Sequence, residues 1–165
     1  MKAEILIRPY AARDAARCCE IYNYYIVNTT VTFEEEPLSP EAFGARAAGI
    51  EKNYPYFVAE SDGVVLGYAY LAEYNPRSAY RYTVDLSIYL ARDVTARGIG
   101  SLLYERIERA ARERGFSNII SIITRDNAPS VAFHEKHGFR HVGTFDRVGV
   151  KFGRWLDVAY YQKRL

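Results

Sequence analysis

Apolar and polar residues alternate along several stretches of the chain, a pattern that predicts half-buried β-strands. It is clearest in 82–90, where the even-numbered positions are apolar and Asp85 and Ser87 lie on the other face. The stretch 118–123 is instead a continuous apolar strand, as expected for a buried parallel position. Further strands are predicted at 4–8, 56–60, 64–71, 139–147 and 150–161, the last beginning near Lys151.

Apolar residues spaced three and four positions apart predict helices at 14–27, 102–114 and, after the N-cap Ser39, up to about Lys52. Asn127 is placed to cap a fourth, short helix through Lys136. The strand, helix and next strand between 85 and 123 form a parallel crossover. We therefore expect one α/β domain over residues 1–165, with a mixed sheet and about four helices. The third helix is expected to bury Ile99, Leu102, Leu103, Ile107, Ala110 and Ala111.

Composition excludes several classes of function. The 165 residues are 49% hydrophobic and 25% charged, the profile of a soluble globular protein, and a net charge of +2 is too small to argue for nucleic acid. No apolar run is long enough to cross a membrane, and the N-terminus has no signal-peptide pattern. Adjacent Cys18 and Cys19 make a poor disulfide pair, so we expect reduced thiols and a cytoplasmic location. The three histidines lack a second ligand group, so no metal site is expected.

Two glycines, Gly98 and Gly100, lie between the strand that ends near Leu90 and the helix at 102–114. A glycine turn at the start of a helix presents free backbone N–H groups at the positive end of the helix dipole, and Arg97 adds a charge. Such a turn suits a phosphate or pyrophosphate. No third glycine completes a dinucleotide-binding motif, and no lysine follows Gly100, which excludes the phosphate loop of nucleotide hydrolases. The alternative is an ordinary strand-to-helix loop.

These residues resemble a known motif. Gly98-Ile-Gly100 stands in the place of the acetyl-CoA motif Gln/Arg-x-x-Gly-x-Gly/Ala of the GCN5-related N-acetyltransferase (GNAT) superfamily, although its first position is Thr95 here. The segment 127–139 is similar to the superfamily's second cofactor segment. Along nearly its whole length the chain most resembles the phosphinothricin and methionine sulfoximine N-acetyltransferases, and the stretches that carry this likeness are 30–37, 79–85, 133–135 and 150–158.

The resemblance implies a twisted mixed sheet whose strands part at the middle, with acetyl-CoA as co-substrate in the split. It also implies a homodimer, no metal, and a small-molecule amine as the acceptor. The cofactor-binding residues that it implies are Ile88, Tyr89 and Leu90 through their backbone, then Ala96, Arg97, Gly98, Ile99, Gly100 and Ser101 around the pyrophosphate, and Asn127 on the pantetheine arm.

Acetyl transfer to an amine needs proton transfer, and two residues are candidates for it. Asp85 stands where the family has glutamate; because aspartate is one methylene shorter, we expect it to act through a bridging water. His134 shares a helical stripe with Asn127 and Val131, so it should face the same cleft, and imidazole titrates near neutral pH. We assign the two jointly, leaving open which one takes the amine proton. The alternatives are a solvated carboxylate and a surface histidine.

An amino-acid analogue brings a carboxylate, and an arginine is its natural partner. Arg77 matches the family's basic substrate loop, while Phe33 and Tyr80 would wall the side-chain pocket; an exposed loop charge is the alternative for Arg77. The function expected is acetyl transfer to the α-amine of such an analogue. Two rivals remain: another amine, such as a peptide N-terminus, a polyamine or an aminoglycoside, and a non-catalytic acyl-CoA sensor.

Overall fold

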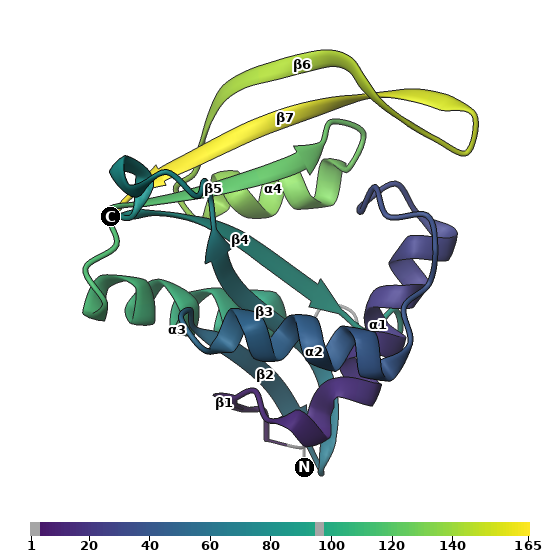
Figure 1. The fold of residues 1–165 in the computed structure, drawn as a ribbon, viewed down its shortest axis with the longest axis vertical. Coiled ribbons are helices and arrows are strands. Elements are labelled where there is room, and N and C mark those ends of the chain that lie inside the picture. Colours follow the sequence, from purple (N-terminus) through teal and green to yellow (C-terminus); the bar gives the residue numbers. More distant parts are fainter. Residues whose placement is uncertain (1–3, 95–97) are drawn as a thin grey trace.

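The computed structural model describes residues 4–94 and 98–165. Within them, seven strands form one mixed sheet in the order β1-β2-β3-β4-β5-β7-β6, in which only β4 and β5 pair in parallel. The sheet runs through the whole molecule in Figure 1, from β1 near the N-terminus to the long β6–β7 hairpin at the far end. The elements are β1 (Leu6–Pro9), α1 (Ala15–Asn28), α2 (Pro40–Glu51), β2 (Tyr56–Ser61), β3 (Val64–Glu73), β4 (Thr83–Leu90), α3 (Ile99–Glu113), β5 (Asn118–Thr124), α4 (Ala128–Lys136), β6 (Arg140–Lys151) and β7 (Arg154–Arg164), with two short 3₁₀ turns, η1 (Ala12–Asp14) and η2 (Ser78–Tyr80).

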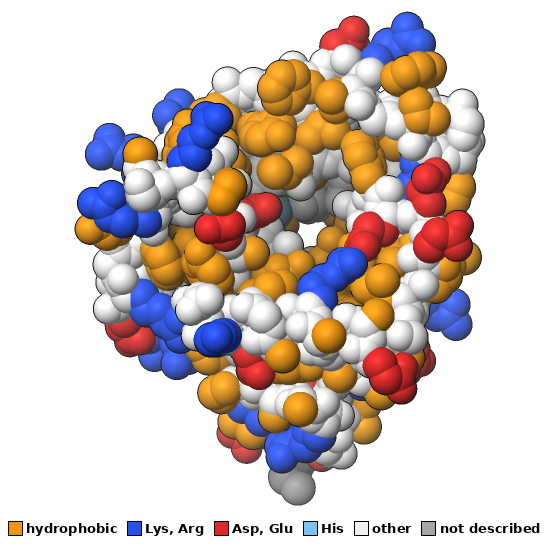
Figure 2. Space-filling view, in the orientation of Figure 1, with side chains coloured by type: hydrophobic (Ala, Val, Ile, Leu, Met, Phe, Trp, Pro, Cys, Tyr) orange, Lys and Arg blue, Asp and Glu red, His pale blue; other side chains and the backbone are white. Residues whose placement is uncertain are grey.

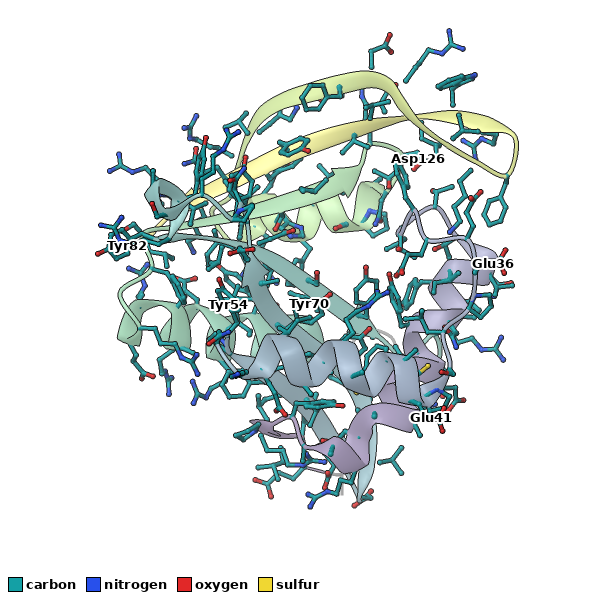
Figure 3. The ribbon with its side chains drawn as sticks, in the orientation of Figure 1. Glu36, Glu41, Tyr54, Tyr70, Tyr82 and Asp126 are labelled. Atoms are coloured by element: carbon teal, nitrogen blue, oxygen red, sulfur yellow. The ribbon has the colours of Figure 1, made fainter. Side chains whose placement is uncertain are left out.

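Helices cover both faces of the sheet, because alternate side chains of each central strand point to opposite sides. On one face, Val84 and Leu86 of β4 pack in a core cluster with α3. On the other, α1 and α2 cover a cluster in which tyrosines of β2 and β3 stack on one another, with 4.8 Å between the ring centres of Tyr56 and Tyr70. Figure 3 places Tyr70 above α2, at the middle of this face. The abundant tyrosines are therefore largely sheet-face residues.

The two central strands stay together over a short length only. β4 and β5 pair at Thr83–Asn118, Val84–Ile119 and Asp85–Ile120. Beyond these pairs β4 continues along β3 and β5 continues along β7, so each strand follows its outer neighbour and the two diverge (Figure 1). The surface is hollowed at this place, with hydrophobic side chains along its upper rim (Figure 2).

Two tight turns close the hairpins of the sheet. Asp62 and Gly63 have φ of 51° and 77°, and Phe152 and Gly153 have φ of 52° and 70°, the positive pair typical of a two-residue hairpin turn. The first turn was predicted. The second corrects the expectation that the last strand begins near Lys151, because Lys151 pairs with Arg154 and ends β6. The predicted gap before residue 150 is an irregularity in β6, where the pairing register shifts between Phe145 and Gly149.

The buried stripe of α3 differs from the predicted one at two positions. Leu102 is 39% exposed, whereas Tyr104 is buried at 1%. The ring of Tyr104 packs against Phe139, with 5.8 Å between ring centres, and against His137. The stripe is therefore rotated toward α4 and the strand that follows it.

Both cysteines are buried and free, as expected, and Ser39 caps α2 by accepting a hydrogen bond from the N–H of Ala42. Within residues 4–94 and 98–165, the helices are all too short or too polar to span a membrane.

Substitution of two adjacent leucines tests the position of this stripe. Leu103→Ala should lower the free energy of unfolding by about 2–5 kcal/mol, because the side chain is fully buried and a cavity would remain. Leu102→Ala should cost less than about 1 kcal/mol, because Leu102 already contacts solvent. Urea denaturation followed by circular dichroism measures both. Equal losses would contradict the orientation of α3.

Candidate active site

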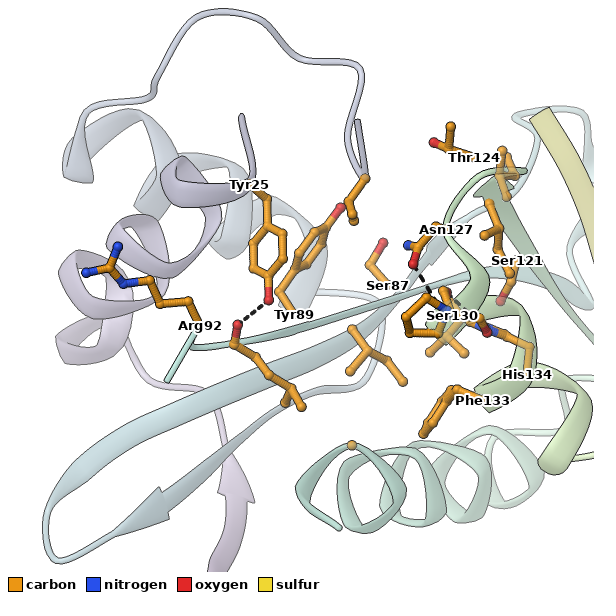
Figure 4. Close-up of a pocket in the computed structure, with 18 of the residues that line it drawn as sticks. Tyr25, Ser87, Tyr89, Arg92, Ser121, Thr124, Asn127, Ser130, Phe133 and His134 are labelled. Atoms are coloured by element: carbon orange, nitrogen blue, oxygen red, sulfur yellow. Dashed lines mark hydrogen bonds between the residues drawn. The ribbon is translucent and has the colours of Figure 1, made fainter. Parts of the chain in front are cut away.

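A cavity of about 450 Å³ occupies the gap between the diverging strands. Its walls come from the second half of β4, from β5 and from α4 (Figure 4). Ile88, Tyr89 and Leu90 line it from one side, and Asn127 and His134 from the other. The structure therefore brings these five predicted residues together in one cleft.

The β4 side of the cleft offers backbone hydrogen-bonding groups. β4 pairs with β3 as far as Leu90, so only half of its N–H and C=O groups are used there. The others face the gap, since β5 has already turned away after Ile120. One is taken: the hydroxyl of Tyr25 donates to the carbonyl oxygen of Leu90. An extended molecule with amide groups can pair with the rest much as a strand would.

The start of α3 forms the floor of this cleft. Gly98 is its N-cap with φ of +70°, a left-handed conformation that favours glycine. Gly100 lines the cavity, and a Cβ there would lie 3.3 Å from the ring of Phe133. Ser101 Oγ lies 3.0 Å from His137 Nε2, while the side chain of Ile99 is buried in the core, so only its backbone is available to a ligand. The predicted residues Ala96 and Arg97 lie outside the described residues.

His134 is held in a defined orientation on α4, whose N-cap Asn127 accepts a hydrogen bond from the N–H of Ser130. His134 is 7% exposed, and its Nδ1 lies 2.7 Å from the carbonyl oxygen of Ser130. A carbonyl can only accept, so Nδ1 carries the proton and Nε2 is left as an acceptor. Burial lowers the pKa of His134, so the imidazole is neutral at neutral pH.

Asp85 lies at the last residue pair before the strands part. It belongs to the face of β4 that also carries Ser87 and Tyr89, on the side of Tyr70. Burial raises the pKa of Asp85 to about 6, although a hydrogen bond from the backbone N–H of Leu86 opposes the shift. The carboxyl group thus titrates near neutral pH. The side chain of His134 packs on the other face of the sheet, so the two predicted proton-transfer residues do not contact each other.

A second cavity of about 450 Å³ adjoins the cleft and shares Val31, Tyr89, Ile122 and Thr124 with it. Its remaining walls are Thr32 and the predicted residue Phe33 from the segment 29–38, and four residues of the β6–β7 hairpin. The described residues around it carry no formal charge; they are Val31, Thr32, Phe33, Tyr89, Ile122, Thr124, Phe145, Val148, Val158 and Tyr160.

The β6 strand fixes the wall that carries Phe33. Lys151 is buried at 1% exposure, and its Nζ donates to the carbonyl oxygen of Thr32 over 2.7 Å. The ring of Phe33 lies directly over Gly149, where a Cβ would overlap it. Burial lowers the pKa of Lys151, partly offset by Glu35 and Glu34. The wall of the second cavity therefore depends on two residues of β6 far away in the sequence.

Arg77 and Tyr80 lie elsewhere. Arg77 is the exposed N-cap residue of η2, and Tyr80 is 43% exposed with its ring 5.7 Å from that of Tyr74. Neither lines the two cavities. In Figure 1, η2 lies near the C-terminus, on the opposite side of the molecule from the segment that carries Phe33. Within one chain the three predicted substrate residues are therefore not brought together.

Among the cleft residues that were not predicted, two carry polar groups that bear on the site. Tyr25 reaches the cleft from α1, within the helix predicted at 14–27. Ser121 lines it from β5, where it is the one polar residue in the run Ile119-Ile-Ser-Ile-Ile123. A lone hydroxyl within an apolar strand was the available signal.

Comparison with known proteins shows which family this chain belongs to. The family model described as an acetyltransferase (GNAT) domain matches residues 7–159. The chain belongs to the GNAT acetyltransferase family. It is 37% identical to phosphinothricin N-acetyltransferase of Streptomyces viridochromogenes, over 95% of this chain and 86% of the relative. It is 35% identical to an L-methionine sulfoximine/L-methionine sulfone acetyltransferase of Pseudomonas paraeruginosa, over 96% and 94%.

A solved structure agrees with this GNAT fold. The phosphinothricin acetyltransferase from Sinorhizobium meliloti, determined in complex with acetyl-CoA, superposes with a TM-score of 0.94 at 36% identity, covering 98% of this chain and 88% of that one. The predicted family and fold class are thereby confirmed. The protein is an acetyltransferase of the phosphinothricin and methionine sulfoximine type, a family whose co-substrate is acetyl-CoA.

Proposed function

We propose that this GNAT acetyltransferase acetylates the α-amine of a small amino-acid analogue. The observation that carries the proposal is the pair of adjoining cavities, one in the gap between β4 and β5 and one beside it. The first cavity is lined by unpaired backbone groups of β4 and by the N-terminus of α3, which suit a long, extended molecule that carries a thioester. The second has the size of a small molecule, is lined by uncharged side chains among the described residues, and shares Val31, Tyr89, Ile122 and Thr124 with the first. The names of the relatives support acceptors of the phosphinothricin, methionine sulfoximine and methionine sulfone kind.

The residues fit acetyl-CoA, which supplies an acetyl thioester when bound. The free backbone groups of 88–90 would hold its pantetheine arm by strand-like pairing, with Asn127 opposite them. The free N–H groups at the start of α3, from Gly98 to Ser101, would hold the pyrophosphate, favoured by the helix dipole. Gly100 keeps the space beside Phe133 open.

Asp85 and His134 would both take part in proton transfer, from opposite faces of the sheet. Asp85 has a raised pKa and pairs with no cation among the described residues, so it is suited to accept the proton of the attacking amine, directly or through water. His134 is neutral with a free Nε2 lone pair, so it would accept a hydrogen bond on the cofactor side. This division is part of the proposal.

We further propose that the chain forms one domain and associates as a homodimer. The continuous seven-stranded sheet supports the first point. The exposed apolar side chains of β6 and its turn support the second; they are Val142, Phe145, Val148, Val150 and Phe152. Association through another copy would also give Arg77 and Tyr80 a route to an acceptor that they do not reach within one chain.

Thiol release from acetyl-CoA with a panel of amines tests the acceptor class. Phosphinothricin, methionine sulfoximine and methionine sulfone should be turned over strongly, because each carries an α-amine on a small carbon skeleton. Spermidine and a short peptide serve as contrasts. Turnover of the contrasts alone would move the acceptor to another class, and tight acetyl-CoA binding without any turnover would favour a sensor.

The pH dependence of turnover tests Asp85. A base acts in its deprotonated form, so kcat/KM should rise as pH increases through about 6, the raised pKa of this carboxyl. Asp85→Asn should lower kcat by about 100-fold or more, flatten this rise and leave acetyl-CoA affinity nearly unchanged. Asp85→Glu is the matched control that keeps a carboxylate. A variant that retained the wild-type pH profile would remove Asp85 from proton transfer.

Arg77→Ala tests the carboxylate partner. KM for an acceptor with a carboxylate should rise about tenfold, and kcat should change little, because the loss would be of ground-state binding. The same variant assayed with the amide of that acceptor is the control, since the amide offers no charge to pair. An unchanged KM for the acid would place Arg77 outside the substrate site.

A further inference from the structure

Ser121 carries a buried hydroxyl group that has no hydrogen-bond partner in the part of the chain that the structure describes. It is 1% exposed, and its Oγ contacts no donor or acceptor among the described residues. Burial of an unpaired polar group is unfavourable, and such groups are few in folded proteins, so each one calls for an explanation. An isoleucine or alanine would suit the surrounding apolar run of β5 better. The hydroxyl group therefore makes the fold less stable than an apolar side chain of similar size would.

This hydroxyl belongs to the cleft and lies beside His134. Ser121 lines the cavity, and its partner across the β5–β7 ladder is Tyr161, whose ring centre is 6.5 Å from that of His134. Figure 4 draws Ser121 and His134 on the same side of the cavity, opposite Tyr89 and Ser87. A ligand in this cavity would therefore lie next to both Ser121 and His134.

The side chains on the two faces of β5 contact different parts of the molecule. Ser121 shares its face of β5 with Ile119 and Ile123, which pack in the core cluster of α3 and α4. Ile122 and Thr124 lie on the opposite face of β5 and line the second cavity. A thioester whose carrier lay over the start of α3 and whose acetyl group pointed into the second cavity would have its sulfur on the Ser121 side of β5.

We propose that the Ser121 hydroxyl donates a hydrogen bond to the coenzyme sulfur as the sulfur gains negative charge; this inference rests on the proposed function. During transfer the amine nitrogen bonds to the acetyl carbon, the carbon–sulfur bond breaks, the sulfur keeps the electron pair and the amine proton passes to Asp85. His134 has its one proton on Nδ1, committed to the carbonyl of Ser130, so neutral His134 cannot donate at Nε2. Ser121 offers a hydroxyl donor on this side, where Asn127 and Ser130 also line the cavity, and this hydroxyl is fixed in place before the charge forms.

Ligand affinity tests the contact without turnover. At about pH 9, above the ordinary pKa of a thiol near 8.5, calorimetry should show that the wild-type protein binds CoA more tightly than desulfo-CoA, which has no sulfur. Ser121→Ala should weaken CoA binding about tenfold and leave desulfo-CoA binding unchanged, since a hydrogen bond to a charged atom is lost. Equal weakening of both ligands would show a packing role only and overturn the proposal.

Turnover and stability supply the second readout. Ser121→Ala should lower kcat by about 10- to 100-fold with KM for acetyl-CoA nearly unchanged, and Ser121→Thr, which keeps a hydroxyl, should recover most of the rate. The melting temperature of Ser121→Ala should not fall, because no partner is left unpaired.

Ser61→Ala is the matched control for both measurements. Ser61 is another buried serine with an unpartnered Oγ among the described residues, at the β2–β3 turn and outside the cleft. Its removal should change neither kcat nor CoA affinity. A kcat for Ser121→Ala within twofold of wild type would overturn the role of Ser121. Absence of wild-type turnover on every amine would instead reject the proposed function, while the comparison of CoA with desulfo-CoA would still decide whether Ser121 contacts the sulfur.

Discussion

The three-residue parallel pairing of β4 with β5 is the constraint on which the rest of the structure depends. It holds the two halves of the sheet together at one end and lets them separate at the other. A longer pairing would close the cleft and bring the polar edges of both strands together. A shorter one would leave β1–β4 and β5–β7 as two sheets joined mainly through α3. The separation is stable because β3 and β7 satisfy each strand on its outer side.

Burial shifts the pKa values of Asp85 and His134 in opposite directions. It raises the pKa of Asp85 to about 6 and lowers that of His134, because low polarity disfavours a charge of either sign. An acid and a base with ordinary values well apart are thus brought toward the same pH range without an ion pair between them. The two side chains lie on opposite faces of the sheet and do not contact each other.

Much of this arrangement follows from local sequence. The alternation in 82–90, the glycines at 98 and 100 and the shared stripe of Asn127 and His134 all predict features that the structure contains, because each depends on neighbours within a few residues. Other features depend on distant partners. The burial of Tyr104 in place of Leu102 depends on packing against Phe139. The burial of Lys151 depends on the carbonyl oxygen of Thr32, 119 residues away in the sequence. No periodicity in one segment reports such contacts. The grouping of Phe33 with Arg77 and Tyr80 failed within one chain for the same reason.

The order in which the chain is made gives the sheet's topology a consequence for its assembly. Synthesis proceeds from the N-terminus, so β1 to β4 and α3 exist before β5, and β7, which covers the other edge of β5, is completed only at Arg164. Until then β5 is held by three residue pairs, and its isoleucine-rich edge is open to pairing with other chains. The wall that carries Phe33 must also wait for Lys151. A nascent or truncated chain therefore has the walls that β4 and α3 give the cleft before it has the second cavity, and its risk of misassembly is concentrated on β5.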